Sequence, residues 1–300
     1  MLPRPFFPLL LRILLFFVLL PLPLNPQRLS AQEKPYFVTY SHDLEEPGNL
    51  EVESRTDLAR PDASTRFAAE ATEFEYGLRA WWTTELYLEG QTTPADSTLF
   101  TGFRIENRVR PILRELPVNP VLYIEYENIS GADKTLLEVV GHDSQSDLAV
   151  PNAIARHTMQ HEAETRLILS SNLRAWNLSE NFIAEKNLGH APWEFGYALG
   201  ATRPLVTAAS PHPCSLCLQN LTAGAELYGD LGDAASLTLA RTSHYLAPLL
   251  GWQATPSMRL TFSPGFGLTS TALNRVYRIG LAYEFDQFGS RFFARSGGAH

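Results

Sequence analysis

The feature that most constrains the fold of this chain is an alternation of apolar and polar residues, which begins near residue 48. It recurs in segments of eight to twelve residues, separated by clusters of Gly, Pro, Asn, Asp and Ser. In one such segment Phe74, Tyr76 and Leu78 share a face, while Glu73 and Glu75 take the other. A period of two residues is that of a β-strand. The pattern therefore predicts an all-β domain over residues 48–285, with about twelve strands, give or take two.

Alternation alone fits a soluble β-sandwich as well as a β-barrel. Three observations favour the barrel: the strands are long, their polar faces carry Glu and Arg together, and aromatic residues sit at strand ends, as at Trp81, Trp82, Trp176 and Trp193. In hydrocarbon every backbone N–H and C=O must be paired within the protein, and a closed sheet does this with strands of about ten residues. We therefore expect a single antiparallel transmembrane β-barrel.

The first thirty-one residues have the order of a secretory signal peptide. Arg4 opens a basic start, residues 13–20 form the apolar stretch ILLFFVLL, and Ala31 offers a small residue for cleavage. A retained membrane anchor is the weaker alternative, because Arg12 and Pro21 bound the apolar run below the length of a spanning helix. We expect residues 1–31 to be removed, which leaves residues 32–47 as a lead-in segment before the barrel.

The charge balance and the later sequence narrow the classes of partner. The chain has 24 Lys+Arg, of which Arg4, Arg12 and Arg28 precede residue 32, against 32 Asp+Glu. A nucleic-acid partner is not expected on this acidic balance, since phosphate binding needs a basic face. No later segment offers eighteen consecutive apolar residues, so we expect no transmembrane helix in the mature chain. No cofactor is predicted either.

The last predicted strand resembles the β-signal of outer-membrane proteins, in which a polar residue, a Gly and two hydrophobic or aromatic residues recur at fixed spacing. Here those residues are Arg278, Gly280, Tyr283 and Phe285. The resemblance implies recognition by the barrel-assembly machinery, contact with outer-membrane lipid and a location in the outer membrane. A departure is the tail over residues 286–300, because the class often ends at the aromatic residue. As a whole, the chain resembles porin-like outer-membrane proteins.

If the apolar faces contact lipid, the polar faces must point into the barrel. The predicted lumen residues are Glu73, Glu75, Arg79, Glu85, Glu89, Arg104, Glu106, Arg108, Arg110, Glu125 and Glu127. Because acidic residues outnumber basic ones on these faces, an open lumen would favour cations or neutral polar solutes. We therefore expect a porin-like channel or transporter. A closed structural or adhesion barrel, in which these charges pair with each other, is the alternative, and the sequence alone does not determine the oligomeric state.

Residues 128–160 form the longest stretch without strand rhythm, which would suit a constriction loop or a recognition surface. The C-x-x-C of Cys214 and Cys217 has no second pair to complete a zinc site, so a small loop disulfide is the expectation. The spacing of His157 and His161 would suit a metal on a helix, but on a strand the two would lie about 13 Å apart, too far to share an ion, so a pair of loop histidines is the expectation.

An outer-membrane hydrolase is a third alternative to the channel. It would require His142 and Ser144 to meet near the membrane rim, and adjacency in sequence is poor support for a catalytic triad. We do not expect an enzyme.

Overall fold

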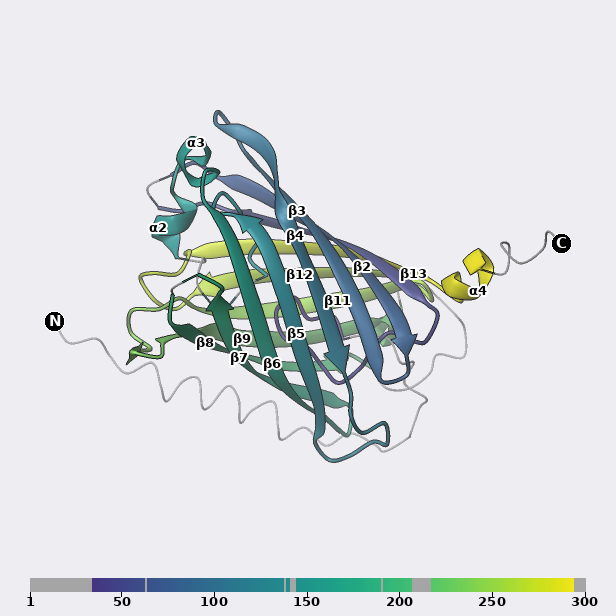
Figure 1. Ribbon diagram of the computed structural model, residues 1–300. Coiled ribbons are helices and arrows are strands. Elements are labelled where there is room, and N and C mark those ends of the chain that lie inside the picture. Colours follow the sequence, from purple (N-terminus) through teal and green to yellow (C-terminus); the bar gives the residue numbers. More distant parts are fainter. Residues whose placement is uncertain are drawn as a thin grey trace.

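The computed structural model describes residues 34–62, 64–137, 139–140, 144–189, 191–206 and 217–293. These residues form one large antiparallel sheet (Figure 1). Its strands are β1 (Leu50–Ala59), β2 (Phe67–Arg79), β3 (Trp82–Thr93), β4 (Ser97–Val109), β5 (Asn119–Ser130), β6 (Met159–Leu173), β7 (Trp176–Asn187), β8 (Trp193–Pro204), β9 (Leu221–Asp233), β10 (Ser236–Leu237), β11 (His244–Thr255), β12 (Met258–Gly267) and β13 (Arg275–Phe285).

The sheet closes on itself. Strand β1 pairs with both β2 and β13, and strand β8 pairs with β9. The two-residue strand β10 pairs only with β9 and extends a hairpin at the rim. The wall is therefore a closed antiparallel barrel of twelve strands, which confirms the predicted architecture and strand number. Closure leaves no free sheet edge, so every wall strand has a partner on both sides.

The two ends of the barrel differ. At the end where β1 begins and β13 stops, which we call the termini end, three hairpins turn through two residues each. The opposite end, which we call the loop end, carries the long connection from Ser130 to Met159, with the short helices α2 (Gln145–Leu148) and α3 (Asn152–Ala155). Figure 1 shows these helices far from helix α4 (Phe288–Phe293), which follows β13.

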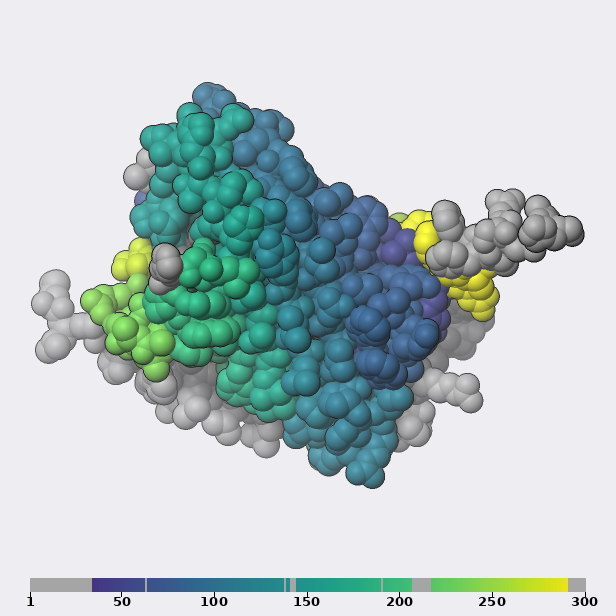
Figure 2. Space-filling view, in the orientation of Figure 1, coloured from purple at the N-terminus to yellow at the C-terminus, as the bar shows by residue number. Residues whose placement is uncertain are grey.

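The outer face of the wall is apolar over most strands. Figure 2 shows the outer surface that strands β3 to β7 form. Large apolar side chains are exposed there, including Leu88, Ile105, Leu122, Ile124, Leu167, Phe182, Ile279 and Leu281. A continuous apolar exterior of this kind is the surface that contacts lipid in membrane barrels. No helix among the described residues is long and apolar enough to span a membrane.

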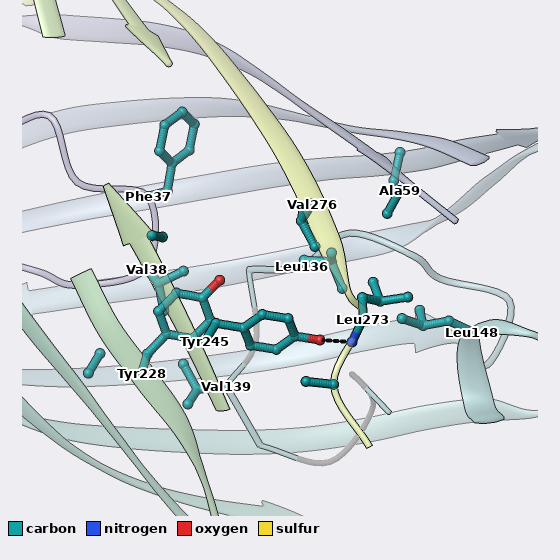
Figure 3. Close-up of a cluster of buried hydrophobic side chains, with 14 of the residues drawn as sticks. Phe37, Val38, Ala59, Leu136, Val139, Leu148, Tyr228, Tyr245, Leu273 and Val276 are labelled. Atoms are coloured by element: carbon teal, nitrogen blue, oxygen red, sulfur yellow. Dashed lines mark hydrogen bonds between the residues drawn. The ribbon is translucent and has the colours of Figure 1, made fainter. Parts of the chain in front are cut away.

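Two segments fill the interior. Residues 34–49, which we call the plug, enter from the termini end and return to it before β1 begins. Residues 131–137 and 139–140, which we call the inner loop, turn into the lumen from the loop end. The two meet in one buried apolar cluster, where Phe37 and Val38 of the plug join Leu136 and Val139 of the inner loop (Figure 3). Residues 34–45 of the lead-in segment predicted from the sequence thus lie inside the barrel.

Candidate functional site

The inner face of the barrel carries one acidic residue on each of ten consecutive strands, and the strand register places these residues directly opposite one another. We call this row the glutamate ladder. From β13 round to β9 it consists of Glu284, Glu51, Glu75, Glu85, Glu106, Glu125, Glu164, Glu185, Glu194 and Asp233. Like charges that face each other directly across a sheet are destabilising. The stability of the sheet therefore does not account for this row.

The ladder runs from one end of the barrel to the other, because the strands of a closed barrel are tilted. Glu51 is the second residue of β1, at the termini end, whereas Glu194 is the second residue of β8, at the loop end. The seven members from Glu51 to Glu185 are at most 4% exposed. Glu284, Glu194 and Asp233, at the two mouths, are partly exposed. The row therefore joins the two mouths through the buried interior.

Arginine side chains from the inner face balance part of this charge. The Arg108 Nη2 atom lies 2.6 Å from a carboxylate oxygen of both Glu75 and Glu85, and its Nε lies 3.2 Å from Glu106. Three further guanidinium groups form ion pairs with ladder members, namely Arg259 with Glu51, Arg104 with Glu125, and Arg166 with Glu164. Buried carboxylates need partners of this kind, since desolvation of an isolated charge is costly.

The balance is nevertheless incomplete. Among the described residues, sixteen buried Asp and Glu side chains face seven buried Arg and Lys side chains. A low-dielectric interior with such an excess of carboxylates favours the uptake of cations or protons. The acidic composition inferred from the sequence is thus concentrated inside the barrel.

One group of carboxylates resembles a metal site by distance alone. Oxygens of Glu73, Glu75 and Glu85 lie within 4.8 Å of one another. Two guanidinium groups, however, already lie among them: Arg55 is 2.7 Å from Glu73, and Arg108 contacts the other two. The arrangement is therefore a charge network of arginines and glutamates.

The backbone of the plug is held by one side chain of the wall. The backbone N–H groups of Phe37, Val38 and Thr39 all donate to the carboxylate of Glu226, over 3.1, 2.9 and 2.7 Å. One wall side chain thus satisfies three consecutive backbone donors. This supplies the partners that buried N–H groups require, although the plug forms no strand.

At the termini end the plug is fastened by charged and polar side chains. His42 hydrogen-bonds through Nδ1 to Ser170 Oγ at 2.8 Å, and its Nε2 lies 3.1 Å from Glu115. Burial lowers the pKa of His42 below its ordinary value, so the neutral ring is favoured while the plug is seated. Burial alone would raise the pKa of Asp43, but Lys34, 3.2 Å away, holds it below its usual range.

The inner loop is anchored differently. The N–H of Leu136 donates to Asp57 at 2.9 Å, and Arg278 donates to the Leu136 carbonyl at 2.9 Å. Lys134 donates to the Thr93 hydroxyl near the loop end. Two cavities lined in part by plug residues have volumes of about 10 Å³ each, which is room for a single water molecule. Next to these plug residues the described part of the lumen thus has little free space.

Nine of the eleven lumen residues predicted from the sequence are buried inside the barrel, namely Glu73, Glu75, Glu85, Glu89, Arg104, Glu106, Arg108, Glu125 and Glu127. Arg79 and Arg110 are not. Arg79 is exposed and follows an irregular pairing after Gly77, and Arg110 follows the end of β4 and pairs with Glu115. Arg110 keeps the inward direction of the residues before it, because its side chain is 14% exposed and its Nη2 lies 3.2 Å from Oδ1 of the buried Asn119 at the termini end. Arg79 lies past the irregular pairing, where alternation no longer sets the direction of the side chain.

Sequence reasoning missed the plug and the alignment of the glutamates. A signal for the plug was present in the small residues of the inner face. A Cβ added at Gly200 would come within 2.5 Å of the Tyr36 ring, and one added at Gly251 within 2.7 Å of Pro35. Inward glycines on long strands leave space that another segment can fill.

The residues of the proposed β-signal divide between the two faces of β13. Arg278 and Gly280 point into the lumen, where Arg278 contacts Asp57, whereas Tyr283 and Phe285 are outward and 47% and 43% exposed. Their role in assembly stays a prediction. Of the tail, Phe288 to Phe293 form α4.

The remaining candidate residues belong to no shared site in the described chain. Cys217 is disulfide-bonded, and Cys214 lies outside the described residues. His161 stacks on Tyr126 of β5, and His157 follows α3, so His161 is a strand residue and not a loop histidine. His142 lies outside the described residues, as does the predicted signal peptide over residues 1–31, and Ser144 caps α2.

Solved structures of outer-membrane proteins have a similar architecture. The KdgM porin matches with a TM-score of 0.50 at 8% identity, over 78% of this chain and 99% of that chain. The COG4313 outer membrane channel from Pseudomonas putida F1 matches with a TM-score of 0.50 at 10% identity, over 80% of this chain and 97% of that chain. The chain has the fold of an outer-membrane β-barrel.

Outer membrane phospholipase A from Escherichia coli also matches, with a TM-score of 0.39 at 10% identity, over 84% of this chain and 96% of that chain. No protein-family model matches this chain, and no curated protein matches it in sequence. At these identities the likeness concerns the fold, and one fold carries many activities, so function must be argued from the interior.

Proposed function

We propose that this barrel is a gated outer-membrane channel for small cations and cationic solutes, with the glutamate ladder as the path and the plug as the gate. The observation that carries the proposal is the ladder, which joins one mouth to the other through seven buried glutamates. Carboxylates that line a pore favour the passage of cations over anions. The destabilising alignment of like charges is explained if the row serves transport.

The way in which the plug is held supports its role as a gate. Its central contacts include hydrogen bonds that backbone N–H groups donate to Glu226 and Asn181, which water can replace when the segment leaves. Both ends of the plug lie at the termini end, so it can withdraw without threading through the barrel. Short turns in membrane barrels face the periplasm, and three two-residue turns lie at this end. The gate therefore faces the periplasm in this proposal.

Planar-bilayer recordings test the channel. The mature protein and a variant lacking residues 34–46 are refolded and compared under a salt gradient. We expect the mature protein to stay closed with brief openings, and the deletion variant to carry a steady, cation-preferring current. A deletion variant that migrates differently on gels before and after heating, and is therefore folded, but carries no current or prefers anions, would refute the proposal.

A matched pair of substitutions tests the path. In the deletion variant, Glu185→Gln removes one ladder charge, whereas Glu180→Gln removes a charge from the outer face of the same strand β7. Cation preference should fall with Glu185→Gln and stay unchanged with Glu180→Gln. If the deletion variant does not fold, Glu226→Gln in the full mature chain provides the gate test, because it weakens the hold on three plug donors.

A closed structural barrel is the second candidate, and the filled lumen favours it. The plug and the inner loop meet in one apolar cluster, as a permanent core would. On this alternative the plug is part of the fold. The deletion variant would then carry no current and would unfold more readily than the mature protein. The channel proposal expects a steady current from the same variant.

A further inference from the structure

The wall of the lumen recognises the plug by its backbone over four consecutive residues. Besides the three bonds to Glu226, Asn181 accepts from the N–H of Tyr40 at 2.7 Å and donates to the carbonyl of the same residue at 2.9 Å. Arg166 donates to the carbonyl of Val38 at 2.9 Å. Three consecutive N–H groups reach one carboxylate because the plug bends at Phe37 and Val38, whereas successive N–H groups of an extended strand point to opposite sides. The wall thus recognises a bent backbone.

Side-chain pockets in the wall accompany these backbone contacts. The ring of Tyr36 lies over Gly200, where an added Cβ would come within 2.5 Å of its Cε1 atom. The ring of Phe37 lies over Gly280, where an added Cβ would be 3.4 Å from its Cε1 atom. The Tyr36 pocket exists because Gly200 lacks a side chain, whereas a Cβ at Gly280 would meet the Phe37 ring at an ordinary contact distance. The wall therefore accommodates two consecutive aromatic residues next to the bend in the backbone.

A third aromatic residue of the plug sits on the glutamate ladder. The guanidinium carbons of Arg108 and Arg166 lie 5.0 and 5.1 Å from the centre of the Tyr40 ring. The Tyr40 hydroxyl donates to Glu106, a ladder member, at 2.8 Å. Cation–π contacts in a desolvated site add to binding. Tyr40 thus couples occupancy of the backbone site to closure of the ladder.

We infer that the lumen contains a binding site for a peptide that bends next to an aromatic pair and carries a third aromatic residue three positions later, and that the plug is the ligand that fills this site from within the chain. The inference deepens the proposed function and rests on its claim that the plug leaves the lumen. A peptide with these features, supplied separately, then competes with the plug and binds over the ladder.

The test uses a synthetic peptide of residues 34–46, carrying a fluorescent label, and the barrel that lacks these residues. Saturable binding is expected, at least tenfold tighter than that of a scrambled peptide of the same composition. Glu226→Gln and Gly200→Ala should each weaken binding at least tenfold. Gly265→Ala is the matched control, because an added Cβ there meets its nearest atom at 3.6 Å, an ordinary contact. Equal binding of the scrambled peptide, or unchanged binding in both variants, would overturn the inference.

The full mature chain gives a second measurement that does not depend on the deletion. Thr39→Cys places a thiol on the buried part of the plug, where the native side chain is 4% exposed. Excess free peptide should speed the reaction of this thiol with a membrane-impermeant reagent, and the scrambled peptide should not. An unchanged rate would argue against exchange.

Conductance separates this inference from the proposed function. Peptide binding without current in the deletion variant would remove the channel and leave the peptide site. Current without peptide binding would support the channel and remove the peptide site.

Discussion

The two segments that fill the lumen are held in different ways. The plug joins the barrel wall at β1, and its central part is held by backbone hydrogen bonds to Glu226 and Asn181 as well as by Phe37 and Val38, which pack in the apolar cluster shared with the inner loop. The inner loop is tied at both ends, to β5 and β6, and buries Leu136, Val139 and Val140 against the wall. Apolar burial is roughly proportional to area and persists only while the contact is dry, whereas hydrogen bonds exchange readily with water.

The contrast assigns different roles to segments that look alike in the closed state. The inner loop completes the core at the loop end, together with Tyr245, whose hydroxyl accepts from the Leu273 N–H at 2.8 Å (Figure 3). The plug fills a preformed space lined by glycines and polar groups. Loss of the plug should therefore open the lumen, whereas loss of the inner-loop contacts should destabilise the barrel.

The largest expected effect comes from placing a charge at equivalent points of the two segments. Leu136 and Val38 are both almost fully buried, at 3% and 1% exposure. Leu136→Asp puts an unpaired carboxylate beside Asp57 and should lower the free energy of unfolding by about 3–5 kcal/mol. Val38→Asp should expel the plug and change the stability of the wall by less than about 1 kcal/mol.

Unfolding in denaturant, followed by the shift between heated and unheated gel mobility, measures both variants. Equal losses of stability would show that the plug is as much a part of the core as the inner loop, and the contrast would not hold.

A smaller effect is expected from the side chain that pairs with Tyr40. Asn181→Leu removes two hydrogen bonds worth about 1 kcal/mol each, so displaced plug should become roughly tenfold or more populated. Reaction of the Thr39→Cys thiol with an impermeant reagent reports this population. Asn187→Leu is the matched control, because Asn187 is on the same strand but bonds Glu162 near the loop end. Comparable rates in the two variants would contradict a specific hold on the plug.

The wall could be predicted from the sequence because alternation is a local property. The outward Phe74 and the inward Glu75 follow directly from their places in a strand, and the same holds for Tyr283 and Glu284 at the end of the last strand. The strand count followed from the same rhythm. Arg79 is exposed for the complementary reason, because no local signal marked the irregular pairing after Gly77.

The ladder and the plug depend on relations between distant residues. That Glu125 faces Glu164 is set by the register across β5 and β6, on either side of a long connection. That residues 34–49 enter the lumen depends on wall glycines more than 150 positions away, such as Gly200. The sequence holds both features, but neither is visible until the strands are paired.

The smallest expected effect is a dependence of plug release on pH. The charged groups around His42 are Lys34, Asp43, Arg110 and Glu115, and burial is the main reason why the pKa of His42 is lowered from its ordinary value of 6.5. When the plug leaves, the ring regains the ordinary value. The released state therefore binds more protons, so acidification below about pH 6.5 favours release, down to the lowered pKa of the seated ring.

Openings of the mature channel should accordingly become several-fold more frequent at about pH 5 than at about pH 7.5. Asp43 contributes in the same direction, but only below its ordinary pKa of 3.8, which lies outside this window. His42→Gln keeps a polar side chain next to Ser170 and removes the titration, so this variant should lose the response while Asn181→Leu keeps it. If His42→Gln retains the full pH response, the titrating group lies elsewhere. The carboxylates of the lumen are then the next groups to test, because acidification protonates them and so weakens the attraction of the ladder for cations.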